Sequence, residues 1–366
     1  MEVKPGYKQT EVGVIPEEWK VARLRATCSM RSGDGITSAR IDQFSRYPCY
    51  GGNGLRGFTS RFTHDGSYAL IGRQGALCGN VLGAEGKFFA SEHAIVVTAL
   101  VQTDIEWLTY VLGEMHLNQY SESSAQPGLS VSKLLNLELA LPPTKSEQRA
   151  IAGALGDVDA LLSALEKLIV KKRDLKQAAM QQLLTGRKRL PGFHGEWKVK
   201  RLGDLLKVRH GKSQHNVTVA DGMYPILATG GEIGRTNQYI YDKPSVLIGR
   251  KGTIDAPRYV ETPFWSIDTL FFTEISDEVS AKFIFYKFNT INWRSYNEAS
   301  GVPSLNASTI EDIEVSVPAF TEQTAIAEVL SDMDAELVAL TQRRDKTRAL
   351  KQGMMQELLT GRIRLV

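Results

Sequence analysis

The chain of 366 residues carries one long internal repeat. Glu147-Gln148 and residues 183–187 recur as Glu322-Gln323 and residues 358–362, both at an offset of 175 residues, and both copies end in Leu-Leu-Thr-Gly-Arg. A solenoid unit spans roughly 20–50 residues, so this repeat is too long to be one. It corresponds to a whole domain plus a helix, duplicated. Two similar halves favour an internal pseudo-twofold axis, which suits a bipartite partner such as duplex DNA.

The repeated segments predict two long helices. Residues 145–185 and 321–360 follow prolines and precede Gly186 and Gly361, where a helix end favours a residue of positive φ. Apolar residues alternate steps of four and three, the spacing of a coiled-coil seam. The predicted seam residues are Ile151, Leu155, Val158, Leu162, Leu165, Ile169, Ile326, Leu330, Met333, Leu337 and Leu340. Such helices most simply pair as an antiparallel coiled coil; the alternative is two amphipathic helices, each on its own domain.

Strand-rich segments flank the helices. The apolar runs 68–71, 94–97 and 245–248 are short and bounded by turn-forming residues, which predicts β-strands. The predicted fold class is α+β: two similar mixed α/β domains separated by two long helices that form an antiparallel coiled coil. The predicted boundaries are 1–145 for the first domain with its N-terminal arm, 146–186 for the first helix, 187–320 for the second domain, and 321–366 for the second helix and tail.

The formal net charge of +3 is small, but its distribution repeats. Residues 23–73 carry eight arginines against three acidic residues, whereas residues 74–145 carry three lysines against seven acidic residues. The second half copies this pattern, with eleven basic and five acidic residues in 198–258 and three basic and nine acidic residues in 259–320. Ordinary surface variation would produce one such asymmetry; two favour a basic face for phosphates in each half.

Three kinds of recurring segment are candidates for nucleic-acid contact. Glycine-rich turns near 47–57 and 224–235 would let the backbone approach phosphate closely, although tight turns between strands explain them equally well. Arg73 and Arg250 follow apolar strands and are placed to reach a phosphate or a guanine edge, unless local carboxylates pair with them. The turns at 126–130 and 302–306 are expected to be structural, with possible helix caps.

The sequence lacks the motifs of several enzyme classes. Residues 209–213 end like a phosphate-binding P-loop, but the glycine required at position 206 is a leucine. No nucleophile–base pair or metal cluster is recognisable. Cys28, Cys49 and Cys78 form no CxxC pair, which is typical of reduced thiols in a cytosolic protein. There is no run of about 18 apolar residues and no apolar signal region, so we expect neither a membrane span nor export.

Four features combine into a specific pattern that covers essentially the whole chain. They are the opening Gly6–Trp19, the half-repeat Leu190–Trp197, the proline followed by Glu-Gln at the start of each long helix, and the twin helix ends. With these features the chain resembles the specificity subunit of type I restriction–modification systems. The resemblance implies that each globular half is a target-recognition domain for one half of a split DNA sequence. It also implies that the paired helices fix the gap between half-sites.

The same resemblance implies partners and cofactors. Two adenine-methylating modification subunits would dock on the equivalent helices, and restriction/translocase subunits would complete the complex. The chain itself would be non-catalytic and carry no cofactor, with S-adenosylmethionine, ATP and Mg²⁺ in the partner subunits. A cytoplasmic location is expected. The alternatives are a specificity module of another restriction or phage-defence system, and a two-lobed coiled-coil scaffold that does not bind DNA.

The predicted DNA-binding residues come from the glycine-rich turns, the strand ends and the basic loops after the first strands. They are Arg31, Arg40, Asn53, Arg56, Arg73, Arg209, Lys212, Gln214, Arg235, Asn237, Arg250 and Lys251. Contacts to phosphates and to bases cannot be separated at this level. If the helices set the gap, four residues inserted near Leu184 would add ~6 Å, or roughly two base pairs.

Overall fold

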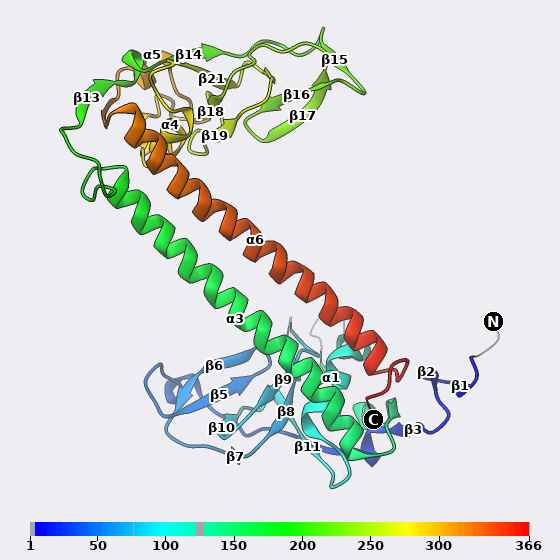
Figure 1. The fold of residues 1–366 in the computed structure, drawn as a ribbon. Helices are drawn as coiled ribbons and strands as arrows, with labels where there is room; N and C mark the ends of the chain where they lie inside the picture. The colour runs from blue at the N-terminus through cyan, green and yellow to red at the C-terminus, as the bar shows by residue number, and fades with distance from the viewer. Residues whose placement is uncertain (1–3, 76, 122–127, 366) are drawn as a thin grey trace. The chain divides into compact units, whose positions relative to one another are not determined.

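The computed structural model describes residues 4–75, 77–121 and 128–365 (Figure 1). The chain forms two compact units. Unit 1 comprises residues 1–165 and 343–366, and unit 2 comprises residues 166–342. The two long helices, α3 (Lys145–Leu183) and α6 (Phe320–Leu358), each begin in one unit and end in the other. Each unit therefore consists of one globular domain, half of α3 and half of α6.

The globular domain of unit 1 is built from short strands with few helices. Its strands are β1 (Tyr7–Thr10), β2 (Gly13–Pro16), β3 (Lys20–Arg23), β4 (Cys28–Ser32), β5 (Tyr47–Gly51), β6 (Gly54–Thr59), β7 (His64–Asp65), β8 (Tyr68–Gly72), β9 (Val81–Ala84), β10 (Lys87–Ala90), β11 (Ala94–Ala99) and β12 (Glu138–Leu141). Its helices are α1 (Ile105–Glu114), α2 (Val131–Leu134) and the 3₁₀ turns η1 (Leu24–Ala26), η2 (Ser38–Arg40) and η3 (Leu117–Tyr120).

The globular domain of unit 2 repeats this plan. Its strands are β13 (Lys198–Arg201), β14 (Leu206–His210), β15 (Thr218–Val219), β16 (Tyr224–Ala228), β17 (Gly231–Thr236), β18 (Ser245–Gly249), β19 (Arg258–Val260), β20 (Trp265–Ser266), β21 (Leu270–Ile275) and β22 (Glu314–Val317). Its helices are α4 (Ala281–Phe288), α5 (Ala307–Glu311) and the 3₁₀ turns η4 (Leu202–Asp204) and η5 (Trp293–Tyr296).

The main sheets of the two domains have the same topology, and the second sheets share three of their four strands. An antiparallel sheet of order β4-β11-β8-β9 in unit 1 corresponds to β14-β21-β18-β19 in unit 2. A second sheet contains an antiparallel hairpin, β5–β6 or β16–β17, and one parallel neighbour, β10 or β20. A two-stranded sheet, β3–β12 or β13–β22, leads to the long helix. The predicted α+β class with duplicated domains is confirmed.

Each core joins a globular domain to the helix ends. In unit 1 the fully buried Trp19 and Trp107 share a cluster with Ile151 and Leu155 of α3 and with Leu358 of α6. In unit 2 the equivalent cluster includes Met180 and Leu183 of α3 together with Ile326 and Leu330 of α6. The ends of both helices therefore belong to the domain cores, and each domain is anchored on two helix segments.

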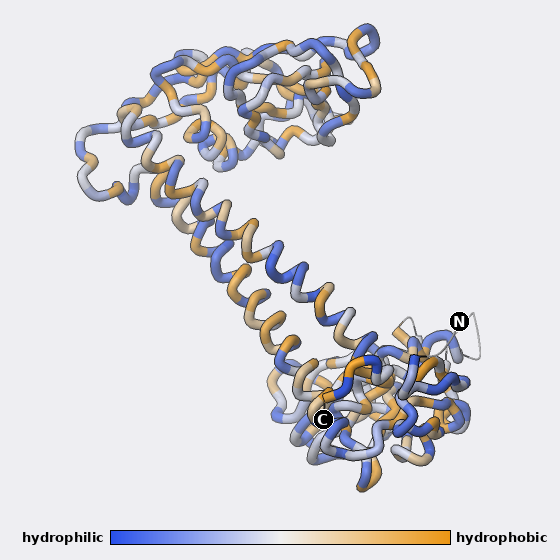
Figure 2. Tube along the Cα trace, turned by 45° about the vertical axis from the view of Figure 1, so that its right-hand side comes forward, coloured by the Kyte–Doolittle hydropathy of each residue, from blue (hydrophilic) through white to orange (hydrophobic). Residues whose placement is uncertain are grey.

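Within each unit the halves of α3 and α6 run antiparallel. In unit 2 Lys172 and Lys176 of α3 form ion pairs with Glu336 and Asp334 of α6, in opposite sequence order. Of the predicted seam, Ile151, Leu155, Leu165, Ile169, Ile326 and Leu330 are buried, and Val158, Leu162, Met333, Leu337 and Leu340 are partly buried. Figure 2 shows hydrophobic stretches recurring along both helices, as the paired-coil prediction requires.

In each unit a cluster of one tyrosine, one aspartate and one lysine connects the helix pair to the globular domain. Tyr110 donates from Oη to Asp159 Oδ2 over 2.8 Å, and Asp159 pairs with Lys351 Nζ at 2.7 Å. In unit 2 Tyr286 donates to Asp334 Oδ2 over 2.8 Å, and Asp334 pairs with Lys176. Burial raises the pKa of both tyrosines, so their hydroxyls stay protonated and donate. In each unit the cluster thus joins α3, α6 and one helix of the globular domain, which is α1 in unit 1 and α4 in unit 2.

A second repeated ion pair links the segment after each long helix to the start of the other long helix. Arg189 Nη2 lies 2.6 Å from Glu322 Oε2, and Arg364 Nη2 lies 3.0 Å from Glu147 Oε2. Both glutamates are almost fully buried, with 2 % and 1 % of the side chain exposed. A bidentate arginine satisfies both carboxylate oxygens, which compensates for removing this charge from water.

Glycines end both long helices as predicted. Gly186 has φ of 70° and Gly361 has φ of 72°. A Cβ at Gly186 would lie 3.3 Å from the ring of Trp197, and a Cβ at Gly361 would lie 2.7 Å from Pro16. The positive φ and the close approach both require glycine. Leu184, just before this turn, is fully buried and its carbonyl accepts from Lys287. An insertion there would disrupt the core of unit 2, so Leu184 is the wrong place to lengthen the helix.

None of the helices among the described residues is long and apolar enough to cross a membrane.

We expect Glu322→Gln to lower the free energy of unfolding by about 2–3 kcal/mol, because Arg189 would lose its charged partner in a largely buried setting. Glu328→Gln, at an exposed position of the same helix, is the matched control and should change it by less than about 0.5 kcal/mol. Urea unfolding followed by circular dichroism measures both. Equal effects of the two substitutions would contradict this role for the pair.

Candidate nucleic-acid interface

In each domain the candidate loops meet at one short segment between two strands. We call this the hub segment; it is residues 90–94 in unit 1, between β10 and β11, and residues 266–270 in unit 2, between β20 and β21. The sequence alone did not single out either segment. Each is positioned by the parallel pairing of β10 with β5 or of β20 with β16.

The basic loop after the first strand of the main sheet binds the hub segment through its backbone. The amide of Asp34 donates to the carbonyl of Ala90 over 2.9 Å, and the amide of Lys212 donates to the carbonyl of Ser266 over 2.8 Å. The preceding glycines allow this approach, because a Cβ at Gly33 would lie 2.3 Å from Ala90 O. Arg31, which lies near the end of β4, and Lys212, in the loop after β14, are therefore held beside the hub segment.

The hairpin strand that leads into the glycine-rich turn also binds the hub segment. Ser91 donates to the carbonyl of Tyr50 over 2.8 Å, and Ile267 donates to that of Leu227 over 3.1 Å. In unit 1 the turn packs against the end of β8, since a Cβ at Gly72 would lie 2.4 Å from Gly52 O. The glycine-rich turn is thus both a turn between strands and a neighbour of the strand-end arginine.

The loops that begin at the strand-end arginines also bind the hub segment. The amide of Arg73 donates to the carbonyl of His93, and that of Arg250 donates to the carbonyl of Thr269, both over 2.9 Å. Their own carbonyls accept from Leu129 at 3.0 Å and Leu305 at 2.9 Å, which brings in the turns predicted to be structural. Gln126 and Pro127 of the first turn lie outside the described residues.

Each hub segment therefore binds two loops and one hairpin strand, and the backbone hydrogen bonds are the same in both units. The side chains at these positions differ between the two units. Ser91, Glu92 and His93 of unit 1 correspond to Ile267, Asp268 and Thr269 of unit 2, as the matching hydrogen bonds show. Backbone bonds place few demands on side-chain identity, so the framework can stay constant while the chemistry that it presents varies.

The predicted DNA-binding side chains fall into two groups. Among the described residues, the side chains of Arg31, Arg40, Asn53, Arg56, Arg73, Lys212, Gln214 and Lys251 have no hydrogen-bond or ion-pair partner; Arg73 and Gln214 are partly buried and the others are exposed. The remaining four are bonded within the domain. Arg209 Nε pairs with Glu274 Oε2 at 2.8 Å, and Arg250 Nη1 donates to Asp268 O over 3.2 Å. Arg235 and Asn237 bind the backbone at Gly222 and Met223.

A β-bulge marks the same place in both hairpins. The register shifts between Cys49 and Tyr50 in unit 1 and between Ile226 and Leu227 in unit 2. The extra residue on the opposite strand is Arg56 in unit 1 and Ile233 in unit 2, and both are exposed. A bulge redirects the side chain of its extra residue. The same bulge therefore exposes a cation in unit 1 and an apolar residue in unit 2.

Burial shifts the pKa values of several titratable side chains in unit 1. It lowers the pKa of His64, whose ring is stacked on Phe88 at a centroid distance of 5.3 Å. The His64 imidazole therefore stays neutral near pH 7. Burial raises the pKa of Cys28 to about 11 and also raises the pKa values of Cys49 and Cys78, so these free thiols stay protonated. The described residues contain no cluster of three metal-ligating side chains.

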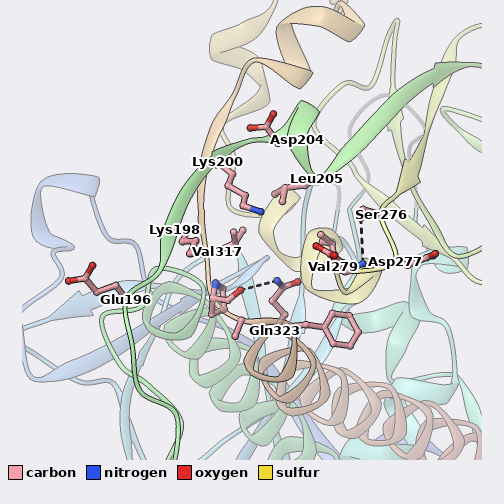
Figure 3. Close-up of a pocket in the computed structure, with 14 residues that line it drawn as sticks. Glu196, Lys198, Lys200, Asp204, Leu205, Ser276, Asp277, Val279, Val317 and Gln323 are labelled. Atoms are coloured by element: carbon pink, nitrogen blue, oxygen red, sulfur yellow. Dashed lines mark hydrogen bonds between the residues drawn. The ribbon is translucent and has the colours of Figure 1, made fainter.

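A pocket of about 580 Å³ lies elsewhere in unit 2, between β13, the loop before α4 and the start of α6 (Figure 3). Lys198, Lys200, Asp204 and Asp277 give its walls both signs of charge. None of the hub residues lines it. It is therefore separate from the repeated interface described above.

A family model for the type I restriction modification DNA specificity domain matches residues 16–173 and again residues 194–348. The chain belongs to this family. Over 166 residues it is 42 % identical to the type I restriction enzyme EcoprrI specificity subunit of Escherichia coli, covering 44 % of this chain and 40 % of that protein. It is 25 % identical over 167 residues to the EcoDI specificity subunit of Escherichia coli, covering 45 % of this chain and 37 % of that protein.

Each of these matches thus covers about two fifths of the relative's length. The fold is shared more widely. The crystal structure of a type I restriction–modification S subunit from M. genitalium superposes with a TM-score of 0.74 at 18 % identity, covering 98 % of both chains. At this identity the likeness concerns the fold alone. It extends through both specificity domains and both long helices.

We expect Gly72→Ala to destabilise unit 1 by about 1–3 kcal/mol, because the added Cβ would lie 2.4 Å from Gly52 O and 2.7 Å from Leu77 O. Gly83→Ala is the matched control in the neighbouring strand β9, where a Cβ meets nothing within 4 Å. Thermal unfolding, together with amide exchange at the hub segment, tests this. Unchanged protection of the His93–Arg73 bond in Gly72→Ala would show that the two loops do not depend on close packing.

Proposed function

We propose that this chain is the sequence-specific DNA-binding specificity subunit of a type I restriction–modification complex. Each globular domain reads one half of a bipartite target. The observation that carries this proposal is the repeated hub segment, whose backbone bonds are the same in both units and whose side chains differ. A common framework with different presented side chains is what two recognition domains for two different half-sites require.

The unpartnered cations support a duplex as the partner. Arg31, Arg40 and Arg56 of unit 1 are exposed and unpartnered among the described residues, as are Lys212 and Lys251 of unit 2. Loops held on a sheet edge by backbone hydrogen bonds can present such groups to phosphates and to base edges together. The family membership points in the same direction, since both matched segments are named for DNA specificity.

The long helices supply the docking sites for the modification subunits in this proposal. Leu175 of α3 and Leu350 of α6 occupy equivalent positions, and they are 47 % and 59 % exposed. Val170 of α3, five residues before Leu175, is 56 % exposed. Equivalent exposed leucines on the two helices provide two similar apolar contact points, one in each unit, for two identical partners.

In this proposal the chain is non-catalytic and carries no cofactor of its own. Methylation belongs to modification subunits that bind S-adenosylmethionine, and cleavage belongs to restriction subunits that use ATP and Mg²⁺. The complex acts on cytoplasmic DNA. The chain contributes binding and spacing, while its partners contribute the chemistry.

Co-expression with the modification subunits, followed by single-molecule mapping of methylated adenine, tests this function. The proposal predicts one bipartite motif with a fixed gap, modified in every copy. A soluble, assembled complex that adds no methylation at any motif would contradict it. The mapped motif then supplies the DNA for binding measurements.

We expect Arg31→Ala to weaken binding to the mapped target about tenfold, through loss of a phosphate or base contact by the first domain. Arg23→Ala is the matched control in the same domain, because Arg23 is exposed and engaged with Glu138 at 3.5 Å. Fluorescence anisotropy at fixed salt compares the two variants. A weakening by Arg23→Ala as large as that by Arg31→Ala would indicate diffuse charge attraction.

We expect Leu175→Asp and Leu350→Asp each to remove one modification subunit from the complex, and the double variant to remove both. A carboxylate in place of a leucine that the docked partner covers should weaken docking about a hundredfold or more. Gln177→Asp, on the opposite side of α3, controls for the added charge and for helix propensity. Native mass spectrometry counts the subunits. Retention of both subunits by the double variant would contradict docking at these leucines.

A further inference from the structure

Each globular domain exposes a large apolar side chain in the turn before its hairpin. Phe44 is 94 % exposed and Met223 is 70 % exposed. Phe44 lies three residues before β5 and Met223 lies one residue before β16, and both strands begin with Tyr-Pro, at Tyr47-Pro48 and Tyr224-Pro225. A single exposed apolar residue carries no meaning, because every protein surface has them. Two in the corresponding turns, each leading into a strand that begins with Tyr-Pro, require an explanation.

A carboxylate holds the turn that presents Phe44. Asp42 Oδ1 accepts from the amides of Phe44 at 2.8 Å and Ser45 at 2.6 Å, and its Oδ2 accepts from the Ser45 hydroxyl at 2.6 Å. The backbone of Asp42 exchanges two further hydrogen bonds with Phe58 of β6, at 2.9 and 2.7 Å. Five hydrogen bonds therefore fix a turn whose tip is a solvent-exposed phenyl ring.

Different side chains hold the turn that presents Met223. Its amide donates to Asn237 Oδ1 over 3.1 Å, and its carbonyl accepts from Arg235 Nη2 over 3.1 Å. Arg235 Nε also donates to the carbonyl of Gly222 over 2.8 Å. Arg235 and Asn237, which are predicted DNA-binding residues, also fix this turn. The two domains thus use unrelated groups to fasten an exposed apolar residue to the second strand of the hairpin.

An exposed aromatic pair lies beside each of these turns. Tyr47 and Phe62 meet edge to face with ring centroids 5.1 Å apart, and Tyr224 and Tyr239 meet in the same way at 5.3 Å. Phe62 is 42 % exposed and Tyr239 is 48 % exposed. In unit 1 the Arg46 guanidinium lies 5.5 Å from the Tyr47 ring centroid, and Lys87 Nζ lies 4.8 Å from that of Phe62. In Figure 1 the hairpins lie on the sides of their domains away from α1 and α4.

We propose that Phe44 and Met223 are apolar wedges, one in each half-site, that enter the DNA duplex and unstack one base step. This inference rests on the proposed function and adds to it a deformation of the target. Apolar side chains such as Phe and Met separate base steps when flanking cations hold the adjacent phosphates. Arg40 and Arg46 are exposed on either side of Phe44 and fit that role.

The preformed turns favour an inserted side chain over a flexible surface contact. A wedge must keep its position while base stacking resists it, so its backbone must be fixed before binding. The hydrogen bonds of Asp42, Arg235 and Asn237 fix that backbone without covering the side chain. Unstacking also depends on which base step is separated, so each wedge contributes to target choice through deformability.

The test uses the chain assembled with its modification subunits and a duplex containing the mapped target. 2-Aminopurine replaces one base at a time across both half-sites, and its fluorescence rises where stacking is lost. We expect a rise at one step of the first half-site, apart from the methylated adenine. Phe44→Ala should abolish that rise and weaken binding about tenfold, while leaving the signal in the second half-site unchanged. Met223→Ala should do the reverse.

Three controls separate the outcomes. Val101→Ala, at an 85 % exposed position of the same unit, should leave fluorescence and affinity unchanged. Phe44→Leu should retain most of the signal, because leucine can also act as a wedge. Both Phe44 variants should keep the wild-type melting temperature, since the ring has almost no contact to lose.

Specific binding by Phe44→Ala with the 2-aminopurine rise intact overturns the wedge and leaves the proposed function standing. Loss of a modification subunit in Phe44→Ala, with DNA binding by the remaining complex unchanged, also overturns it and assigns the tip to a protein contact. Failure of the wild-type complex to bind any mapped motif would instead refute the proposed function, and the wedge with it.

Discussion

Backbone hydrogen bonds to a five-residue segment hold each recognition surface together. Asp34 and Arg73 lie in two separate loops and Tyr50 lies in β5, and all three bind residues 90–94 through main-chain atoms. The same bonds recur in unit 2 around residues 266–270. Because the bonds are made by the peptide groups, the side chains around them can change without loss of the framework. This explains how two domains can share one topology and differ in the groups that they present.

Side-chain bonds differ from these backbone bonds. Where the globular domains contact the long helices, the hydrogen bonds and ion pairs are repeated with the same residue types. The Tyr110–Asp159–Lys351 cluster recurs as Tyr286–Asp334–Lys176, and the Arg364–Glu147 pair recurs as Arg189–Glu322. Partly buried ionic groups tolerate little substitution, since loss of one partner leaves the other uncompensated. The chain therefore conserves chemistry where each domain is fastened to the helices and varies it where the domain faces a partner.

The sequence was sufficient to predict the repeat, the antiparallel helices, their glycine ends and the α+β class, because these follow from local spacing. It did not show that Ile151 and Leu330 belong to domain cores as well as to the helix seam, since this depends on tertiary packing. The hub segment was also missed, because main-chain acceptors leave no signature in residue identity. Arg235 and Asn237 illustrate the same difficulty, because nothing in the sequence indicated that their hydrogen bonds hold the Met223 turn. The predicted DNA contacts and domain boundaries stay predictions.

In the proposed function, two independent recognition domains are joined by a helical spacer. Inserting seven residues into each long helix, between Lys167 and Leu168 and between Gln342 and Arg343, tests this most directly. One heptad in both helices preserves the seam and adds ~10.5 Å, which is about three base pairs. Mapping of methylated adenine should then show both half-site sequences unchanged and the gap between them longer by about three base pairs. An unchanged gap in an assembled, active complex would contradict the account.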